Sequence, residues 1–333
     1  MTGNSLTPLN DVANVVALAG GVGGAKLADG LARCLPPGRL TVIVNTGDDF
    51  EHLGLYICPD LDTVCYTLAG IANPVTGWGR SGDTYSALET LSEFGGPGWF
   101  RLGDRDLGLH LERTRRMRRG ETLSQVTRQF CRTWGIQTSV LPMSDDAIPT
   151  LVYTISENNS ADPDELTFQE YFVHRQCSPR VTGFRFDNVE RARPAPGVLT
   201  ALTQADLVVI CPSNPWVSIG PILAVPGIQS IIESKRAVAV SPIIGGQAVK
   251  GPAAKMYIEL GIEPSALAVA RQYGSLLGGF VMDKIDQEQA ETIQALGAQP
   301  LITDTLMKTS IDRQRLAQQV LEFGLKLDKS PQR

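Results

Sequence analysis

Short apolar runs rich in β-branched residues alternate with helical patterns along much of this chain. Four of the runs have the composition of buried parallel strands: 14–19, 40–44, 207–211 and 237–240. Behind the first run, Leu27, Leu31 and Leu35 recur at four-residue spacing, which predicts a helix over 25–35. The alternation predicts an α/β fold, with a Rossmann-like, mostly parallel sheet and helices on both faces.

Two stretches interrupt the alternation. Helical patterns dominate 73–133, with candidate helices at 84–94 and 124–134, and strand-like stretches follow at 150–155, 171–175 and 180–186. We therefore expect a helical insertion and then a small β excursion. The predicted organisation is a Rossmann-like nucleotide-binding core formed by 12–72 and 195–325, with an inserted helical/β subdomain, 73–194, that covers the acceptor side of its crevice.

A glycine-rich turn follows the first strand directly. In the run Gly20-Gly21-Val22-Gly23-Gly24 four residues have no side chain, so the backbone can approach a phosphate closely. Strand, turn and helix would place several N–H groups and the positive end of a helix dipole at one point. The turn departs from the two common phosphate fingerprints, because Lys26 replaces the third glycine of dinucleotide folds and Leu27 replaces the Ser or Thr of a P-loop. Lys26 either contacts a phosphate or lies solvated on the first helical turn.

Two later strands end in polar turns of a similar kind. Ser213 and Asn214 follow the third apolar run, and Ser241, Gly245 and Gly246 follow the fourth. If these strands are neighbours of the first one in a parallel sheet, the three turns line one crevice that can surround a nucleotide. Each turn taken alone is more commonly just a turn, but their shared placement favours a nucleotide site.

Four aspartates form a second group. Asp48 and Asp49 end the second strand, and Asp60 and Asp62 lie in the first turn of a helix predicted over 60–69. Helix capping accounts for one of them. Four carboxylates around one crevice would repel each other unless a cation or a hydroxyl proton lay between them. The group is typical of Mg²⁺ bridging a diphosphate while one carboxylate positions an attacking hydroxyl.

Composition limits the partners. The chain has 333 residues, 43% of them hydrophobic and 20% charged, with a net charge of -5 and a pI of about 5.4, so nucleic acid is not a favoured partner. Its six cysteines form no C-x-x-C pair and its three histidines are far apart, which indicates a reduced, cytoplasmic protein and disfavours a His/Cys zinc site. No membrane-length apolar stretch or signal-peptide pattern is present. We expect small-molecule substrates and no membrane partner.

Seven motifs occur in order between about residues 15 and 325: AGGVGGAK (19–26), NTGDD (45–49), PDLDT (59–63), GWG (77–79), LGDRD (102–106), PSNP (212–215) and SPIIGG (241–246). Together they resemble the 2-phospho-L-lactate transferase family of coenzyme F420 biosynthesis. The resemblance implies a Mg²⁺-dependent transferase that acts on a guanosine diphosphate-linked three-carbon acid. It would move the phosphorylated acid onto the terminal ribityl hydroxyl of the deazaflavin Fo and release GMP.

The resemblance also implies a role for each matching residue. The guanosine diphosphate part would be bound by Gly20, Gly21, Gly23, Gly24, Lys26, Ser213, Asn214, Ser241, Gly245 and Gly246. Asp49, Asp60 and Asp62 would be catalytic, with Asp60 and Asp62 serving the metal or the incoming hydroxyl. Asp49 would contact Fo, and Asp83 and Thr84 are further candidates on the acceptor side. The acid itself, phospholactate, phosphoenolpyruvate or phosphoglycerate, stays open.

Two other functions account for part of the pattern. A nucleotide-sugar-binding regulatory protein of the gluconeogenesis-factor type would explain the glycines and the serine turns, but neither the acidic segments nor the motif at 77–79. An NAD-dependent oxidoreductase would need the third glycine and a suitably placed catalytic base. The oligomeric state also stays open, although exposed helices in the insertion could pair in a homodimer.

Overall fold

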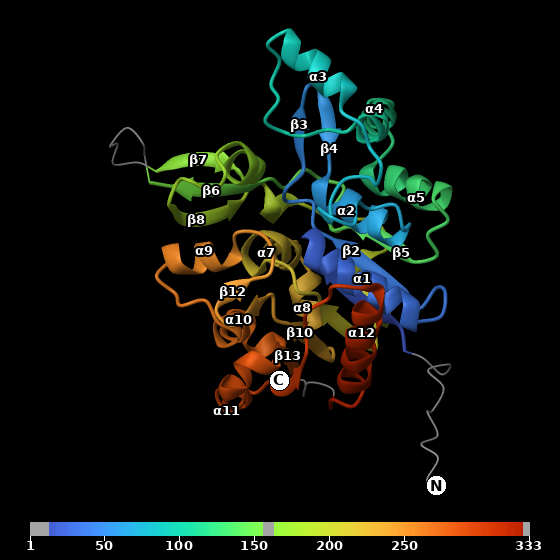
Figure 1. Cartoon of the computed structure of the whole chain (residues 1–333). Coiled ribbons are helices and arrows are strands. Elements are labelled where there is room, and N and C mark those ends of the chain that lie inside the picture. The colour runs from blue at the N-terminus through green and yellow to red at the C-terminus, as the bar shows by residue number, and fades with distance from the viewer. Residues whose placement is uncertain (1–12, 156–162, 329–333) are drawn as a thin grey trace.

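The structure is a computed structural model that describes residues 13–155 and 163–328 (Figure 1). Within this part of the chain, seven parallel strands form one sheet in the order β14-β13-β10-β9-β1-β2-β5. The strands are β1 (Val15–Ala19), β2 (Leu40–Val44), β5 (Ser139–Pro142), β9 (Leu207–Ile210), β10 (Ala237–Val240), β13 (Gly279–Asp283) and β14 (Gln299–Thr303). The predicted Rossmann-like, parallel α/β fold is confirmed.

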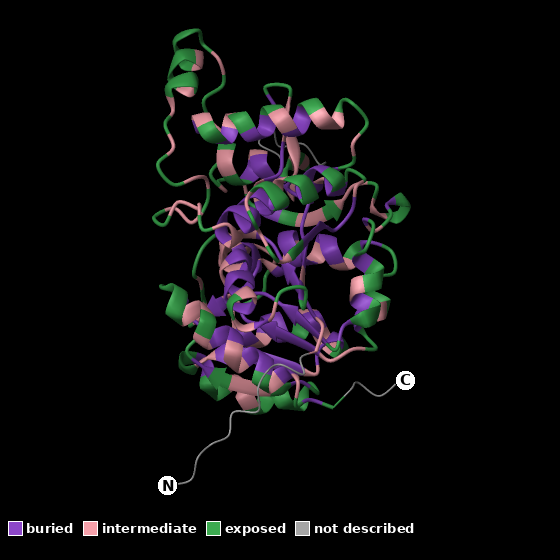
Figure 2. Cartoon of the chain, turned by 90° about the vertical axis from the view of Figure 1, so that its right-hand side faces the viewer, coloured by how far each residue is buried: buried purple, intermediate pink, exposed green. Residues whose placement is uncertain are grey.

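Helices cover both faces of this sheet because successive strand side chains point to opposite sides. In β1, Val15, Ala17 and Ala19 pack into one apolar core, while Val16 and Leu18 pack into the other. The first core is completed by α1 (Gly21–Cys34), α2 (Pro59–Leu68) and α12 (Ser310–Gly324). The second is completed by α6 (Val198–Gln204), α8 (Ile228–Ile232), α10 (Ala266–Tyr273) and α11 (Ala290–Ala295). Figure 2 shows these buried layers in the body of the molecule.

The first helix begins earlier than its leucine spacing predicts. α1 starts at Gly21, with Gly20 as its N-cap residue, so the glycine turn is itself the first turn of the helix. Glycine lowers intrinsic helix propensity, which is why the sequence pattern placed the start at residue 25. Tertiary packing overrides that preference here. The helix predicted at 60–69 is found as α2, within one residue of its expected ends.

The insertion contains more than helices. A hairpin of β3 (Phe50–His52) and β4 (Leu55–Ile57) precedes it, followed by α3 (Ser86–Glu93), α4 (Asp104–Met117) and α5 (Leu123–Thr133). α3 projects from the body at the top of Figure 1 and buries none of its residues. The stretch 73–194 also contains β5, which forms the edge strand of the central sheet beside β2.

The β excursion is a small antiparallel sheet in the order β7-β6-β8, formed among the described residues by β6 (Thr150–Thr154), β7 (Asp164–Thr167) and β8 (Val181–Phe186). The strand predicted over 171–175 is instead a π-helical turn, Glu170–His174. The segment begins three residues after the end of β7, and its backbone bonds within a helical turn, with the Arg175 N–H donating to the Glu170 carbonyl oxygen at 2.8 Å. Its Tyr171 is fully buried against the small sheet instead.

The order in which the chain adds strands to the sheet reverses at β1. The chain moves outward from β1 to β2 and β5, then returns to place β9 on the other side of β1 and continues through β10 to β14. Ligands of open α/β sheets bind in the crevice that such a reversal leaves at the carboxyl ends of the strands. Gly20, Pro212 and Ser241 follow three strands that meet at this edge. Two short hairpin strands, β11 (Ile243–Ile244) and β12 (Gln247–Ala248), then lead to α9 (Ala253–Glu259), and α7 (Gly220–Ala224) follows the β9 turn.

Candidate active site

The turns after β1, β9 and β10 lie on neighbouring strands, as the sequence analysis required, and they line one cavity of about 640 Å³. This volume is in the usual range for a nucleotide or another small ligand. The predicted nucleotide residues that line it are Gly20, Gly21, Gly23, Lys26, Ser213, Asn214 and Ser241. Gly24, Gly245 and Gly246 are not part of the lining. Gly24 packs behind the turn, and the Gly245 N–H donates to the Asp286 carboxylate.

Glycine is required at the start of α1 because other groups approach its backbone closely. A Cβ atom at Gly23 would lie 2.2 Å from the Pro212 carbonyl oxygen, and one at Gly20 would lie 2.5 Å from Asp60 Oδ2. Gly21 has a φ of +62°, a conformation that favours glycine. The first N–H groups of a helix have no partner inside it. The sequence therefore places bare, donor-rich backbone against the cavity, where an anion is electrostatically favoured.

The polar side chains of the other two turns are engaged in holding those turns. Ser213 Oγ accepts a hydrogen bond from the Gly20 N–H at 3.0 Å and donates to the Gly20 carbonyl oxygen at 2.8 Å, which joins the β9 turn to the β1 turn. Asn214 Oδ1 accepts from the Trp216 N–H at 2.9 Å. Ser241 Oγ donates to the Ile243 carbonyl oxygen. These side chains shape the cavity, while the α1 backbone presents the anion-binding groups.

Lys26 lines the cavity but its ammonium group has a protein partner. Lys26 Nζ donates to the Met307 carbonyl oxygen at 2.8 Å, and burial lowers the pKa of this lysine. The side chain therefore connects α1 to the segment before α12. To contact a phosphate, Lys26 would have to give up its hydrogen bond to Met307.

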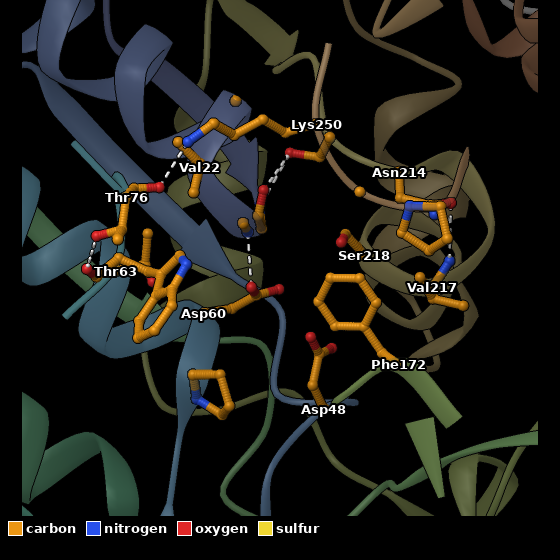
Figure 3. A pocket seen from close by; sticks show the side chains of 18 of the residues that line it. Val22, Asp48, Asp60, Thr63, Thr76, Phe172, Asn214, Val217, Ser218 and Lys250 are labelled. Carbon is orange, nitrogen blue, oxygen red and sulfur yellow. Dashed lines mark hydrogen bonds between the residues drawn. The ribbon is translucent and has the colours of Figure 1, made fainter. Parts of the chain in front are cut away.

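Asp48 and Asp60 form a buried carboxylate pair on the cavity wall. Asn45 Nδ2 donates to Asp48 Oδ1 and, at 2.9 Å, to Asp60 Oδ2, so one amide lies between the two acids. Asp60 Oδ1 also accepts from the Gly21 N–H at 2.6 Å. Figure 3 shows Asp48 and Asp60 near each other, with Asp60 on the side of the glycine turn. The pair therefore lies beside the N-terminal start of α1, where an anion would bind.

The protonation of this pair follows from its burial. Burial raises the pKa of Asp48 well above its usual range, and the charge of Asp60 raises it further. Burial also raises the pKa of Asp60 to about 6, against the opposing hydrogen bonds from Asn45 and Gly21. Two buried carboxylates that share one amide donor cannot both ionise easily, so one of them keeps its proton or a cation neutralises the pair.

We expect Asp60 to make the free protein less stable as the pH rises. Its folded pKa of about 6 exceeds the ordinary value of 3.8, so between those values the native state binds more protons than the unfolded state. The free energy of unfolding then falls over that window by about 2–3 kcal/mol and stays low above pH 6. Urea denaturation at pH 4.5 and 7.5 should show this loss in the wild type and a smaller one in Asp60→Asn. Glu89→Gln on exposed α3 is the control, and an identical pH dependence in the Asp60 variant would contradict the raised pKa.

Asp62 lies on the same helix but is neutralised by a buried arginine. Arg113 from α4 donates to both Asp62 oxygens, with Nη1 at 3.0 Å from Oδ2. Burial raises the pKa of Asp62, and Arg113 opposes that rise. His110 Nδ1 lies 3.8 Å from Asp62 Oδ2, and burial lowers the pKa of His110 well below its usual range, so the imidazole is neutral. Both Asp62 oxygens are thus committed to α4.

Asp49 is buried beside the cavity but does not line it. Neither of its oxygens has a hydrogen bond of good geometry among the described residues, and the Cys58 thiol and the Tyr56 hydroxyl are polar neighbours. Burial raises the pKa of Asp49 well above its usual range. The structure thus separates the adjacent pair of the sequence: Asp48 faces the cavity, and Asp49 is buried towards β4.

Asp83 and Thr84 lie outside the cavity lining, at the start of α4. Asp83 Oδ1 accepts from the Arg105 N–H at 2.8 Å and Oδ2 from the Asp106 N–H at 3.2 Å, so Asp83 caps a helix whose own N-cap residue is Gly103. Thr84 Oγ1 donates to the Asp104 carboxylate. Both side chains support the local fold of the insertion.

Replacement of Asp83 by alanine should therefore cost stability and leave the acceptor affinity unchanged. We expect a loss of about 1–2 kcal/mol in the free energy of unfolding, the usual cost of removing a helix cap. Thermal denaturation and the KM for Fo would be measured together, with Glu93→Ala on exposed α3 as the matched control. A large rise in KM without loss of stability would instead support the acceptor role predicted from the sequence.

The cavity has an aromatic lining that no sequence motif indicated. Trp78, Trp99, Phe100, Phe168 and Phe172 contribute to it, and we call these five residues the aromatic wall; they come from the insertion and the β excursion. The Phe168 and Phe172 rings are stacked with centroids 5.4 Å apart. In Figure 3, the Phe172 ring faces the Asp48 carboxylate. The wall offers flat apolar faces to a planar ring. The four-residue spacing of Phe168 and Phe172 is a sequence signal that could have indicated it.

A metal ion in this cavity would need the substrate to supply some of its ligands. In the described part of the chain, no three His, Cys, Asp or Glu side chains are grouped so that they could hold a metal ion. Asp48 and Asp60 nevertheless supply two carboxylates, which are hard oxygen ligands, on the cavity wall beside the N-terminal start of α1. Mg²⁺ is commonly held by one or two carboxylates together with substrate phosphate oxygens. These residues fit that mode, whereas Asp62, paired with Arg113, does not.

Comparison with known proteins shows which family this chain matches. A family model described as 2-phospho-L-lactate transferase CofD matches residues 15–321. A phosphoenolpyruvate transferase of Streptomyces griseus is 44% identical, over 93% of this chain and 98% of that protein. One of Nocardia farcinica is 39% identical, over 91% and 93%. A solved structure of a UPF0052 family member from Bacillus halodurans covers 93% of this chain and 98% of that one, with a TM-score of 0.59 and 16% identity, which shows a shared fold. No helix in the described residues has the length and apolar character needed to cross a membrane.

Proposed function

Because the chain belongs to the 2-phospho-L-lactate transferase CofD family, we propose that it transfers a phosphorylated three-carbon acid to the deazaflavin Fo in coenzyme F420 biosynthesis. The donor is the acid linked to guanosine diphosphate, and GMP is the leaving group. The similar phosphoenolpyruvate transferases favour phosphoenolpyruvate as the acid. The enzyme is then a transferase of substituted phosphate groups.

One observation carries the proposal: a single cavity is lined by an anion-binding helix start, a carboxylate pair and the aromatic wall. The start of α1 suits the donor diphosphate. The aromatic wall suits the planar deazaflavin ring. Asp48 and Asp60 lie between them, so the reacting hydroxyl and the diphosphate would meet at the carboxylates.

The transfer is a displacement at phosphorus that needs positioning more than covalent catalysis. The ribityl hydroxyl oxygen attacks the phosphorus that carries the acid, the P–O bond to GMP breaks, and the hydroxyl proton passes to the ionised member of the Asp48–Asp60 pair. Backbone N–H groups at the start of α1 stabilise the charge on the transferred phosphate. A bound Mg²⁺ would neutralise phosphate charge during this step.

The proposal redistributes the roles predicted for the aspartates. Asp60 keeps its predicted role, and Asp48 takes the place of Asp49 because Asp48 lines the cavity. Asp62 positions α2 through its pair with Arg113 and is left out of the metal site. Asp48 and Asp60 are thus the two proposed ligands of Mg²⁺, and Asp49 is proposed as a buried neighbour of the pair.

The test is a product assay with purified protein, Fo, Mg²⁺ and each of three guanylylated acids, those of phosphoenolpyruvate, phospholactate and phosphoglycerate. Mass spectrometry should detect Fo joined to the phosphorylated acid together with an equal amount of GMP, most rapidly with the phosphoenolpyruvate donor. GDP in place of the donor is the control.

Formation of no Fo-linked product with any donor would overturn the proposed function. Binding of a uridine nucleotide-sugar, with no affinity for Fo, would favour the regulatory alternative. Product from a different donor would retain the transferase and change only the acid.

A further inference from the structure

The donor of the proposed reaction carries a negative group that the diphosphate-binding elements do not explain. Besides its diphosphate, a guanylylated three-carbon acid has a carboxylate. The acidic side chains on the wall of the cavity, Asp48, Asp60, Asp62 and Asp106, would repel that group. A cation on the wall is therefore needed to bind it.

Three lysine or arginine side chains line the cavity among the described residues: Lys26, Arg101 and Lys250. Lys26 Nζ is half-buried and already donates to the Met307 carbonyl oxygen. The Arg101 guanidinium lies 4.6 Å from the centre of the Tyr85 ring and belongs to the same segment as Trp99 and Phe100, on the side of the aromatic wall. Neither is placed for the three-carbon acid, which must lie beside the diphosphate.

Lys250 differs from both in its position. It is exposed, whereas Lys26 is half-buried, and its Nζ donates to the Thr76 carbonyl oxygen, a neutral backbone acceptor like the one that Lys26 contacts. Figure 3 shows the Lys250 side chain passing over Val22 of the glycine turn to reach Thr76. Its charge is near enough to Lys26 to contribute to the lowered pKa of that residue. Lys250 is thus a cation directly above the start of α1.

The backbone next to Lys250 has open space on one side. Gly251, the next residue, has a φ of +76° and no atom within 4 Å of the place where a Cβ would be. On the opposite side, a Cβ at Gly77 would lie 2.6 Å from Val22 Cγ1 and 3.4 Å from Lys250 Nζ, so the three groups meet at one point of the cavity wall. A small shift of the lysine side chain would turn its ammonium group from Thr76 towards the cavity.

We propose that Lys250 binds the carboxylate of the donor's three-carbon acid, exchanging its bond to the Thr76 carbonyl oxygen for an ion-paired hydrogen bond to the ligand. This assignment rests on the proposed function and names the group that recognises the acid within it. A carboxylate acceptor adds the attraction of opposite charges, which a carbonyl oxygen does not offer, so the exchange favours donors that carry a carboxylate. GDP, which lacks the acid, gains nothing from Lys250.

The test pairs two ligands with two forms of the protein. Isothermal titration calorimetry would measure the binding of guanylylated phosphoenolpyruvate and of the β-ethyl ester of GDP, which has a diphosphate ester but no carboxylate. Lys250→Ala should weaken binding of the first ligand about tenfold and change that of the second by less than twofold. Lys250→Arg should keep most of the affinity. Lys326→Ala, an exposed lysine outside the cavity, is the control.

Equal weakening of both ligands would overturn the assignment, because Lys250 would then bind the diphosphate or support the fold. Unchanged binding of both would overturn it as well, as would a carboxylate-dependent loss in Arg101→Ala with none in Lys250→Ala. The proposed function fails on a different measurement, the absence of Fo-linked product from the wild type. The two results can therefore be told apart.

Discussion

Asp60→Asn should lower kcat about 1,000-fold while the protein stays folded. The substitution removes one ionisable oxygen of the pair that we propose receives the hydroxyl proton and would hold Mg²⁺. Loss of a general base or of a charge-stabilising group commonly costs 10²- to 10⁴-fold. Asparagine keeps the side-chain shape and an oxygen that can accept from the Gly21 N–H. Steady-state kinetics with Fo and the guanylylated donor would measure the effect.

The same variant should lose less stability than the wild type between pH 4.5 and 7.5, because it no longer ionises a carboxylate whose pKa burial raises to about 6. Its amide nitrogen replaces an oxygen that accepts from Asn45 or from Gly21, so some stability is lost at every pH. Thr90→Ala on α3, outside the cavity, serves as the control variant, and it should keep the kcat and the stability of the wild type. If kcat fell only in proportion to the folded fraction, the catalytic role of Asp60 would be wrong.

Arg113→Met should destabilise the protein by about 3–5 kcal/mol, the usual cost of leaving one member of a buried ion pair without its partner. Arg113 is 3% exposed and bonds to both oxygens of Asp62, so methionine would leave that carboxylate buried and uncompensated. The pair joins α2, which carries Asp60, to α4 of the insertion. Urea denaturation would give the loss, together with the yield of folded protein.

A double variant keeps this prediction testable if Arg113→Met does not fold. Asp62→Leu with Arg113→Met removes both charges, and it should recover most of the stability because apolar replacement of a whole buried pair is often neutral. Recovered stability with kcat near that of the wild type would support a positioning role for Asp62. Recovered stability with abolished Mg²⁺-dependent activity would instead support the metal role that the sequence resemblance implied.

The central sheet was predictable because its strands are encoded locally. Buried parallel strands are continuous apolar runs, and β2 matches its predicted run at both ends. β5 was missed because Ser139–Pro142 is short, with an exposed first residue and a proline at its end, features that weaken a strand signal. The segment at 171–175 carries a strand-like composition, but it forms a helical turn whose Tyr171 packs against the small sheet, and no local pattern reports that packing.

The start of α1 illustrates how far a motif can be interpreted. The clustered glycines indicated close backbone approach, and the structure supplies the groups that approach: Pro212, Ser213 and Asp60. The helical conformation of the same glycines was not predictable from propensity. It results from packing against the β9 turn, as in the bonds between Gly20 and Ser213, which are 193 residues apart in sequence.

The sequence by itself determined the parallel α/β architecture, the carboxyl edge at which the site lies and the resemblance to a transferase family, because apolar runs, glycine clusters and motif order are properties of neighbouring residues. Only the tertiary structure decided what each carboxylate does. Asp48 faces the cavity while Asp49 is buried, and Asp60 joins the glycine turn while Asp62 joins Arg113. The pKa and the availability of a carboxylate depend on its burial and on the charge packed against it. Those partners come from distant segments that only folding brings together.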